Sequence, residues 1–174
     1  MAMNIDNIVL IGMPGSGKST IGVLLAKTVL YDFIDTDIVI QNICKKTLCD
    51  IIKKEGTAEF LKTENRILSQ ISAQKTVIAT GGSAVYGEAA MRNLKNGGIT
   101  VYLRLDTDEI KRRIDNINTR GVVMEKGQTI ESLFLERNPL YEKYADITVD
   151  CNGLTPEQCV EKIIEHIKTD ASSN

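Results

Sequence analysis

The sequence predicts an α/β fold in which a five-stranded parallel sheet is covered by helices on both faces. Short runs rich in β-branched residues alternate with longer helical patterns, and no internal repeat interrupts this order. A glycine-rich loop of the phosphate-binding kind joins the first such run to the first helical pattern. Because 174 residues suit a single hydrophobic core, we expect one domain spanning residues 1–174.

The candidate strands are short apolar runs. The first contains Ile8-Val9-Leu10-Ile11, a continuous apolar run typical of a strand that is buried on both faces. Similar runs recur along the chain, each separated from the next by a helical pattern. We therefore expect strands at Asn7 to Ile11, Asp32 to Asp35, Thr76 to Thr80, Ile99 to Leu105 and Ile147 to Asp150.

The stretches between these runs repeat apolar residues at the helical period, as in the C-terminal series Val160, Ile163, Ile164 and Ile167. This period predicts helices at Lys18 to Leu30, Asp37 to Cys44, Leu48 to Lys54, Ala58 to Ala73, Glu88 to Leu94, Thr107 to Ile117, Ile130 to Tyr144 and Pro156 to Lys168. The polar stretch 116–128 contains two glycines and no clear period, so we expect an irregular excursion there.

The charge balance argues against two classes of partner. Lys and Arg number 21 against 23 Asp and Glu, so the chain lacks the basic excess that holds nucleic acid by neutralising phosphates. No uncharged apolar run is long enough to span a membrane, and residues 1–6 do not resemble a signal peptide. We therefore expect a cytoplasmic protein that binds neither nucleic acid nor membranes.

Cysteine and histidine chemistry is also not indicated. The cysteines Cys44, Cys49, Cys151 and Cys159 form no C-x-x-C pair and stand beside apolar residues, so we expect buried, reduced thiols. The single histidine, His166, lies off the apolar stripe of its helix and is expected to face water. Catalysis or metal binding that depends on histidine is thereby excluded.

The strongest motif is the segment Gly12-Met13-Pro14-Gly15-Ser16-Gly17-Lys18-Ser19, which fits the pattern G-x-x-x-x-G-K-S/T. Its glycines allow the main chain to wrap around an anion with the N–H groups turned inward. Lys18 would supply positive charge to the β and γ phosphates, and the Ser19 hydroxyl would ligate Mg²⁺. The strand before it and the helix after it argue against a chance match, so we predict a nucleoside triphosphate site.

Two aspartates close the second expected strand. Asp35 and Asp37 stand at the carboxyl end of the sheet, the edge at which the glycine-rich loop also opens. Alternation along an extended segment would point both carboxylates to one side. One can hold a metal ion there and the other can accept the proton of an attacking hydroxyl. Alternatively, one of them caps the following helix, an explanation that covers one aspartate but not both.

Taken together, these residues resemble the shikimate kinases over the region from Gly12 to about Pro156. The resemblance is carried by the glycine-rich loop, Asp35-Thr36-Asp37, the segment from Glu55 to Glu64, Gly81-Gly82-Ser83, Thr119-Arg120-Gly121 and Arg137-Asn138-Pro139-Leu140-Tyr141. The loop occurs in many nucleotide-binding proteins, whereas the whole set is much more specific.

The resemblance implies a P-loop kinase three-layer sandwich with a mobile lid at about 116–128 and an acceptor-binding segment at about 36–65. It also implies transfer of the γ-phosphoryl group of ATP, with Mg²⁺, to the 3-hydroxyl of shikimate in the pathway to chorismate and the aromatic amino acids. The expected partners are ATP and a small polyhydroxy acid, and we expect a monomer.

The resemblance further implies roles for individual residues. The catalytic residues would be Lys18, Asp37, as the base, and Arg120, and the metal ion would be held by Ser19 and Asp35. ATP would be bound by Gly12, Gly15, Ser16, Gly17, Lys18, Ser19, Thr20, Arg113, Arg120 and Pro156. Shikimate would be bound by Asp37, Gly81, Gly82, Ser83 and Arg137. Without the resemblance, Arg113 and Arg120 would be read as solvated charges, and Arg137 as an ion-pair partner of Glu136 or Glu142.

Three positions depart from the family pattern. Leu61 stands where the family has an arginine that binds the shikimate carboxylate, Ser83 replaces a third glycine, and Gly121 replaces a proline in the lid. Loss of a charge-assisted contact costs about 1.5–3 kcal/mol, so the carboxylate site is expected to be half-built. Two alternatives therefore stay open. One is a kinase of this fold that acts on another small hydroxylated acid such as gluconate, and the other is a nucleotide-binding relative with weak turnover.

Overall fold

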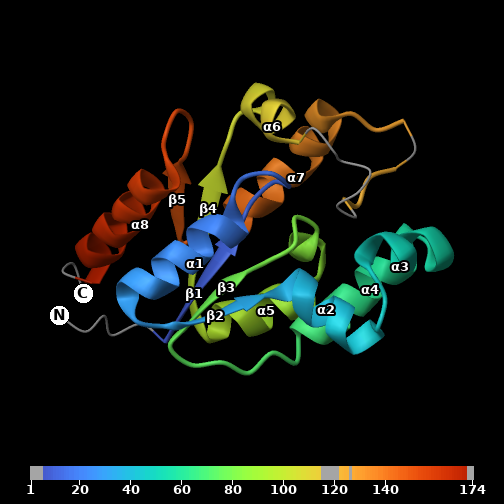
Figure 1. Cartoon of the computed structure of the whole chain (residues 1–174), viewed down its shortest axis with the longest axis horizontal. Helices are drawn as coiled ribbons and strands as arrows, with labels where there is room; N and C mark the ends of the chain where they lie inside the picture. The colour runs from blue at the N-terminus through green and yellow to red at the C-terminus, as the bar shows by residue number, and fades with distance from the viewer. Residues whose placement is uncertain (1–5, 115–121, 126, 172–174) are drawn as a thin grey trace.

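Five parallel strands form the centre of the fold (Figure 1). The structure is a computed structural model that describes residues 6–114, 122–125 and 127–171. The strands run in the spatial order β2-β3-β1-β4-β5. Their bounds are β1 Asn7–Ile11, β2 Asp32–Asp35, β3 Thr76–Ala79, β4 Gly98–Arg104 and β5 Ile147–Asp150. The predicted parallel sheet is confirmed, and each strand differs from its expected bounds by at most one residue at an end.

The order of the strands creates a crevice at the carboxyl edge of the sheet. β1 lies between β3 and β4, and all pairs are parallel, with Leu10 opposite Ala79 and Ile11 opposite Tyr102. From β1 the chain moves outward to β2, whereas from β3 it crosses to β4 on the other side. Such a switch point leaves room for a ligand beyond the strand ends. The loops after β1 and β3 therefore face the same space.

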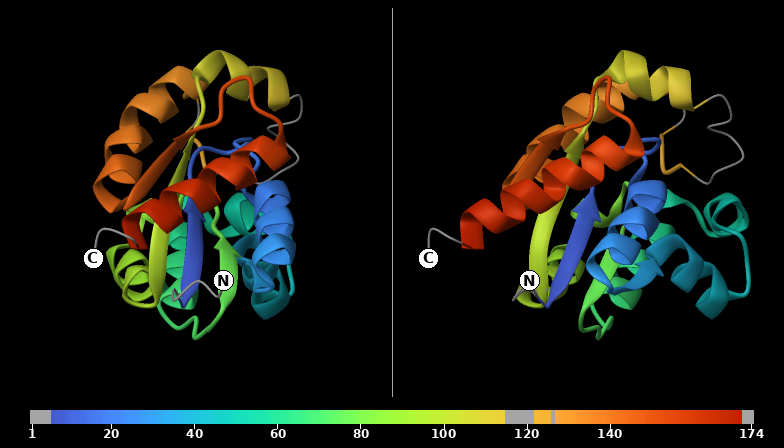
Figure 2. Two further views of the ribbon diagram at one scale, coloured as in Figure 1. Left: turned by 90° about the vertical axis from the view of Figure 1, so that its left-hand side faces the viewer. Right: turned by 60° about the vertical axis from the view of Figure 1, so that its left-hand side comes forward.

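Helices cover both faces of the sheet. α1 and α8 pack together and contact β3 and β5 on one face, and α5 and α7 contact β4 from the other face (Figure 2). The helices are α1 Lys18–Val29, α2 Thr36–Cys44, α3 Leu48–Glu55, α4 Thr57–Leu68, α5 Glu88–Asn96, α6 Thr107–Arg113, α7 Ile130–Tyr144 and α8 Pro156–Ala171, with a 3₁₀ turn at Ala84–Tyr86. The three-layer arrangement is thus as predicted, and only the 3₁₀ turn was not expected.

Two helices end several residues earlier than the sequence predicts. α4 was expected to reach Ala73, but it ends at Leu68 because the side chain of Asn93, on α5, donates to the carbonyls of Leu68 (3.1 Å) and Ile71 (2.8 Å). These bonds satisfy main-chain groups that a longer helix would satisfy itself. α6 was expected to reach Ile117, but it ends at Arg113 because Ile114 leaves the helical conformation. Residues 115–117 lie outside the described ranges.

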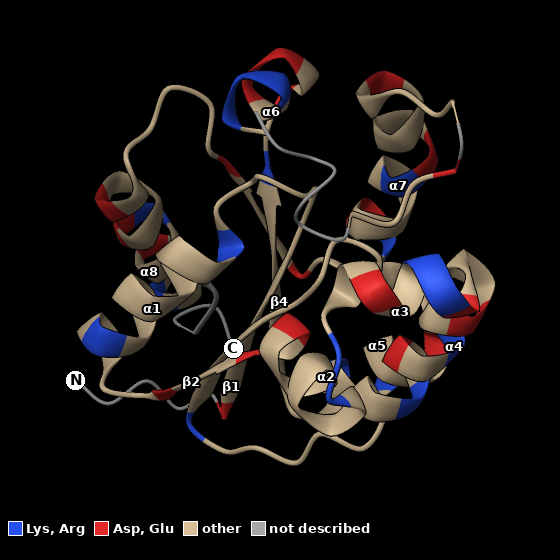
Figure 3. Cartoon of the chain, turned by 45° about the vertical axis from the view of Figure 1, so that its right-hand side comes forward, with Lys and Arg blue, Asp and Glu red and all other residues tan. Residues whose placement is uncertain are grey.

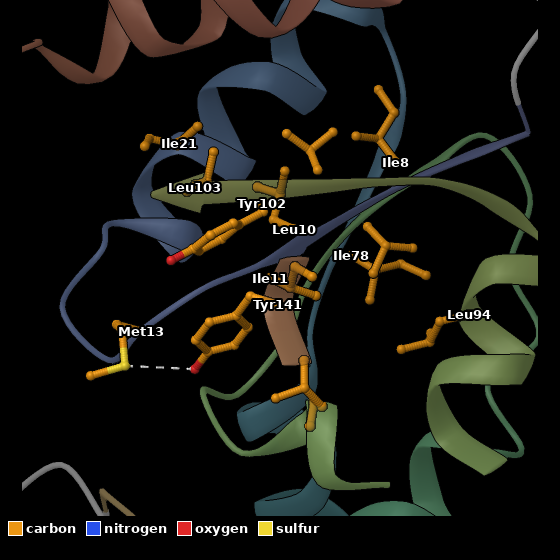
Figure 4. Packing of buried hydrophobic residues seen from close by; sticks show 14 of the residues in the cluster. Ile8, Leu10, Ile11, Met13, Ile21, Ile78, Leu94, Tyr102, Leu103 and Tyr141 are labelled. Atoms are coloured by element: carbon orange, nitrogen blue, oxygen red, sulfur yellow. Dashed lines mark hydrogen bonds between the residues drawn. The ribbon is translucent and has the colours of Figure 1, made fainter. Parts of the chain in front are cut away.

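The core is densest around β1 and continues into α7. Residues 8–11 are fully buried, as the apolar run predicted. The rings of Tyr102, on β4, and Tyr141, on α7, stack with their centroids 5.1 Å apart. Beside them the Tyr141 hydroxyl lies 3.9 Å from the sulfur of Met13, in the loop after β1 (Figure 4). This packing connects α7 to the glycine-rich loop.

The four cysteines form no disulfide, but not all of them are buried. Cys151 and Cys159 are buried as expected, whereas Cys44 and Cys49, on α2 and α3, are only half-buried. The expectation of burial was wrong for these two because the short helices α2 and α3 lie beside the sheet and cover little of it. His166 is exposed, as predicted, and its Nδ1 lies 2.8 Å from the Lys162 carbonyl oxygen. Of the helices that the structure describes, none is long and apolar enough to cross a membrane.

Candidate functional site

The glycine-rich loop forms a closed cradle between β1 and α1. It begins at Gly12, whose φ of +147° is rarely adopted by residues with a side chain. A Cβ atom there would lie 2.8 Å from the main-chain oxygen of Leu103, so the loop also needs glycine for its close approach to β4. α1 starts directly after the loop, at Lys18, and directs the positive end of its dipole into the cradle. The geometry is that of an anion site.

Lys18 is buried in this cradle, with 7% of its surface exposed. Its ammonium group donates to the main-chain oxygens of Gly12 (2.7 Å) and Met13 (2.8 Å), and more weakly to the Ser16 hydroxyl (3.3 Å). Burial lowers the pKa of Lys18 to about 8, and the negative charges of Asp37 and Asp35 oppose this effect. The cradle thus holds a positive charge that lines the crevice at the carboxyl edge of the sheet.

Asp35 joins the end of β2 to the cradle. Its Oδ2 accepts a hydrogen bond from the Ser19 hydroxyl at 2.6 Å. Its Oδ1 accepts from the main-chain N–H groups of Asp37 (3.0 Å) and Ile38 (3.4 Å), so Asp35 is also the N-cap of α2. The capping interpretation and the metal-site interpretation therefore apply to the same residue.

Asp37 reaches the crevice in a different way from the one predicted. The segment is not extended at this point, because Asp37 lies in the first turn of α2 rather than on a strand. The prediction of alternation was wrong here, since the cap at Asp35 starts the helix one residue earlier than expected. Burial, with a contribution from Asp35, raises the pKa of Asp37 to about 6, against the lowering effect of Lys18. Both carboxylates still face the cradle.

The turn after β3, residues 81–83, lies beside the carboxyl group of Asp37. Three bonds hold it from different elements. The Gly81 N–H donates to the Thr36 hydroxyl (3.1 Å), the Tyr141 hydroxyl donates to the Gly82 oxygen (2.7 Å), and the Ser83 hydroxyl donates to Glu64 (2.7 Å). The Ser83 hydroxyl is therefore already bonded to a buried carboxyl group, and the contact of Ser83 with the acceptor stays a prediction.

Glu64 is a residue that sequence reasoning missed. It lies on α4 with 2% of its surface exposed, and its Oε1 has no hydrogen-bond partner among the described residues. Burial raises the pKa of Glu64 to about 7; the Ser83 hydroxyl opposes this effect and the charge of Asp37 adds to it. A signal was available, because Glu64 occupies the buried stripe of α4 between Phe60 and Ile67, where a charged residue is rarely found.

Arg137 is the second buried cation of the site, with 1% of its surface exposed. Its Nε donates to the Tyr86 hydroxyl (3.1 Å) and its Nη2 to the Val123 main-chain oxygen (2.6 Å). The guanidinium carbon also lies 5.1 Å from the centroid of the Tyr86 ring. Its partners are thus not Glu136 or Glu142, so the surface ion-pair interpretation was wrong. Nη1 is the nitrogen that faces Gly82.

A cavity of about 630 Å³ connects these groups. Its lining brings together most of the residues expected from the sequence, namely Gly15, Gly17, Lys18, Ser19, Thr20, Asp37, Gly81, Gly82, Ser83, Arg113, Arg137 and Pro156. Gly12, Ser16 and Asp35 stand just behind this lining. The Nε of Arg113 also donates to Glu109 (2.8 Å). Arg113 therefore lines the cavity and is also paired within its own helix.

Some expectations fall outside the described residues. Arg120, Gly121 and most of the expected lid are among them, and of that lid the structure describes residues 122–125 and 127–128. Val122 and Val123 line the cavity. Leu61 is half-buried against the core. Among the described cations of α4, Lys62 is exposed and paired with Glu59 (3.2 Å), and Arg66 is also exposed. Neither replaces the missing arginine.

The donor set near Ser19 and Asp35 suits a hard divalent cation. A hydroxyl oxygen and a carboxylate oxygen stand 2.6 Å apart beside the anion cradle. Mg²⁺ is commonly held by one or two protein oxygens together with phosphate oxygens and water. The described ranges contain no cluster of three or more His, Cys, Asp or Glu side chains suited to a metal ion. The arrangement can present a hydroxyl group near Asp37 to a phosphate held at Lys18.

Comparison with known proteins agrees with this geometry. A model of the shikimate kinase family matches residues 14–168. A shikimate kinase of Thermodesulfovibrio yellowstonii is 38% identical over 162 residues, covering 91% of this chain and 93% of its own. The structure of Acinetobacter baumannii shikimate kinase in complex with shikimate superposes with a TM-score of 0.89 at 30% identity, covering 97% and 96% of the two chains. A Sinorhizobium meliloti gluconokinase shares only the fold, with a TM-score of 0.51 at 18% identity over 96% and 94% of the chains.

The buried Glu64 makes stability depend on pH. Because its pKa is about 7 in the folded state against 4.5 when unperturbed, the unfolded chain loses the proton first as the pH rises, and this ionisation favours unfolding. We expect Glu64→Gln to remove the effect. Between about pH 5 and about pH 8, the free energy of unfolding of Glu64→Gln should increase relative to that of the wild type by about 2–3 kcal/mol, as measured by urea denaturation. Glu59→Gln, on the exposed face of α4, is the control, and parallel pH curves for Glu64→Gln and the wild type would contradict the prediction.

Proposed function

The chain belongs to the shikimate kinase family, and on that premise we propose that it transfers the γ-phosphoryl group of ATP to the 3-hydroxyl of shikimate, a step toward chorismate and the aromatic amino acids. The observation that carries the proposal is a single cavity in which the buried Lys18 ammonium, the Asp37 carboxyl group and the Arg137 guanidinium converge at the end of the sheet. These groups match a phosphate, a hydroxyl and a carboxylate.

Phosphate binding and charge stabilisation form the first part of the proposal. The N–H groups of the loop from Gly12 to Thr20 would hold the β and γ phosphates, and Lys18 would turn from the Gly12 and Met13 carbonyls to the phosphate oxygens. The transferred group spreads negative charge over its equatorial oxygens in the transition state. A fixed cation is most effective there because it is already desolvated and needs no reorganisation.

We propose that Asp37 is the base that acts on the acceptor. The acceptor half of the cavity is the part lined by Asp37, Gly81, Gly82 and Arg137. A carboxyl group with a pKa of about 6 is ionised near neutral pH, yet it is basic enough to take the proton of the attacking hydroxyl as the oxygen bonds to phosphorus and ADP leaves. Gly81 and Gly82 offer main-chain groups with no side chain in the way. Arg137 would bind the carboxylate of the acceptor through Nη1, since its Nε and Nη2 already donate within the protein.

The remaining site residues would enclose the nucleotide. Arg113 and Pro156 lie on the cavity wall beyond the glycine-rich loop, where we propose that they flank adenine. Arg120, in the proposed lid at 116–128, would reach the phosphates from above. Exclusion of water by such a lid suppresses hydrolysis of ATP. This assignment rests on the family motif at these positions.

We propose Mg²⁺ as the metal cofactor. The Ser19 hydroxyl and the Asp35 carboxylate supply the hard oxygen ligands that this ion prefers, at the place where the phosphates would lie. The ion would offset negative charge on the phosphates when bound. Asp35 is held in place by its second role as the cap of α2, so this ligand keeps its orientation without the ion.

The wider setting of the protein is part of the same proposal. We propose one kinase domain over residues 1–174, with the acceptor-binding segment at about 36–65, acting as a cytoplasmic monomer. Four cysteines that form no disulfide suit a reducing compartment. Both signs of charge are interspersed on the described helices, for example on α3, α4 and α6 (Figure 3), an arrangement that does not favour binding of nucleic acid.

One observation favours a second candidate. With Leu61 in place of the family's arginine and two nitrogens of Arg137 already engaged, the described part of the site offers a carboxylate little more than Nη1. A related hydroxylated acceptor with a different anionic group would need less from this position. A nucleotide-binding protein with weak turnover would need no acceptor at all.

Release of ADP in a coupled assay distinguishes these functions. We expect shikimate to stimulate ADP release from ATP and Mg²⁺, whereas gluconate, CMP and the absence of an acceptor should leave it at the background rate. The physical reason is that a rigid cyclic acid presents a hydroxyl to Asp37 and a carboxylate to Arg137 at once, whereas gluconate would first lose the conformational freedom of an open chain. Stimulation by gluconate alone would favour the second candidate, and no stimulation by any hydroxyl compound would favour the protein with weak turnover.

The base role of Asp37 has its own test. Asp37→Asn removes the group that takes the hydroxyl proton, and we expect kcat to fall by about 10²- to 10⁴-fold while the dissociation constant for ATP is unchanged. The ADP-release assay should show the loss of turnover, and calorimetry should show that ATP binding is retained. Asp32→Asn, at the exposed start of β2, is the matched control. An Asp37→Asn enzyme that keeps most of its turnover would remove Asp37 from this role.

The half-built carboxylate site can be completed by substitution. Leu61→Arg places a guanidinium group at the position of the family's arginine, one turn before Glu64 on α4, and we expect kcat/KM for shikimate to rise by about tenfold. Ala58→Arg, on the exposed side of the same helix, adds the same charge away from the site and should leave kcat/KM unchanged. An unchanged or lower value for Leu61→Arg would show that the site needs no second cation.

A further inference from the structure

The proposed mechanism leaves one buried titratable group without a task. Glu64 lies on the inner face of α4, with Phe60 one turn before it and Ile67 one turn after it, and only 2% of its surface is exposed. A carboxyl group at such a position is uncommon unless it is paired. Its retention in the core therefore calls for a physical explanation.

Glu64 is held by a single contact in the part of the chain that the structure describes. Its Oε2 accepts a hydrogen bond from the Ser83 hydroxyl at 2.7 Å, and its Oε1 is buried without a partner. One neutral donor is a weak compensation for a desolvated carboxylate. Removal of that donor would leave both oxygens unsatisfied.

The unpartnered oxygen lies directly behind the acceptor half of the cavity. A Cβ atom on Gly81 would lie 2.8 Å from Glu64 Oε1 and 2.7 Å from Asp37 Oδ1, so the two carboxyl groups converge on the same point. Gly81 itself lines the cavity. Any shift of Glu64 is thus transmitted to the main chain that faces the acceptor.

Two of the family departures border this carboxyl group. Leu61 precedes Glu64 by three residues on α4, a spacing at which an arginine would reach it. Ser83 is the residue that bonds to it. The loss of a cation at one neighbour of Glu64 therefore coincides with the gain of a hydroxyl donor at another.

We propose that Glu64 is a positioning residue for the acceptor half of the site, and that the Ser83 hydroxyl anchors it in place of the cation that Leu61 does not provide. The inference rests on the proposed function. The turn from Gly81 to Ser83 is held by Thr36 from α2, by Tyr141 from α7 and by Glu64 from α4. Glu64 supplies the third support and thereby sets the distance between the glycines and Asp37.

A double-mutant cycle on Ser83 and Glu64 tests this role. We expect Ser83→Ala and Glu64→Ala each to raise KM for shikimate about tenfold, with KM for ATP unchanged. If Ser83 acts only through Glu64, the double variant should be no worse than either single variant. Additive increases in KM would mean that Ser83 touches the acceptor directly, and they would overturn the proposal. An equal rise in KM for ATP would do so as well, because it would indicate a general structural defect.

Two further variants separate positioning from packing. Glu64→Gln keeps the size of the side chain and an oxygen that can accept from Ser83, so its KM for shikimate should stay near the wild-type value. Leu61→Arg combined with Ser83→Ala should restore a low KM, since the guanidinium group can pair with Glu64. Absence of this rescue would contradict the anchoring role. Ser69→Ala, which removes a hydroxyl at the far end of α4, is the control and should leave KM unchanged.

Thermal unfolding tests the contact between Ser83 and Glu64 independently of the proposed function. Without any acceptor, Ser83→Ala should lower the Tm of the wild type but not that of Glu64→Ala, and Leu61→Arg should restore the lost stability. If the wild-type enzyme shows no ADP release with shikimate, the proposed function fails, and the thermal cycle still decides whether Ser83 anchors Glu64. Equal decreases in Tm in both backgrounds would refute the anchor.

Discussion

The buried ammonium group of Lys18 is the charge on which the site depends. It is desolvated in the loop after β1, and two main-chain oxygens compensate for the lost water. The acidic pair that opposes it lies at the end of β2, with β3 between the two strands. A side chain at position 81 would collide with Asp37 and one at position 82 with Pro14, so the two glycines allow the turn after β3 to approach both elements closely. The crevice is thus a consequence of strand order together with two missing side chains.

The acceptor half of this crevice is supported from outside the sheet. Thr36, Tyr141 and Glu64 each bond to the turn after β3, and they come from three different helices. Tyr141 also packs between Tyr102 and Met13, so α7 contacts the acceptor side and the phosphate side at once. A substitution in any of these helices can therefore alter acceptor binding without touching the acceptor, since each helix holds the turn through one hydrogen bond.

The departures from the family pattern have a common location. Taken singly, Leu61 is a lost contact with the substrate and Ser83 is an added hydroxyl group. In the folded chain both are neighbours of the buried Glu64 carboxyl group, and the cost of burying that group depends on the hydrogen-bond donors around it. Changes at interacting sites are not expected to be additive, so the effect of Leu61 on the proposed activity has to be judged together with Ser83.

By itself, the sequence determined the order of the strands and helices along the chain, the anion cradle and the candidate pair Asp35 and Asp37, because apolar period and loop motifs are local properties. The tertiary structure decided what depends on contacts between distant segments. Asn93 bonds to the end of α4, Arg137 is buried against Tyr86 instead of pairing on its own helix, and the Ser83 hydroxyl bonds to Glu64. Glu64 itself, although it stands in a quoted motif, acquires its unusual environment only from α4 packing against the turn after β3, and no local pattern encodes that approach.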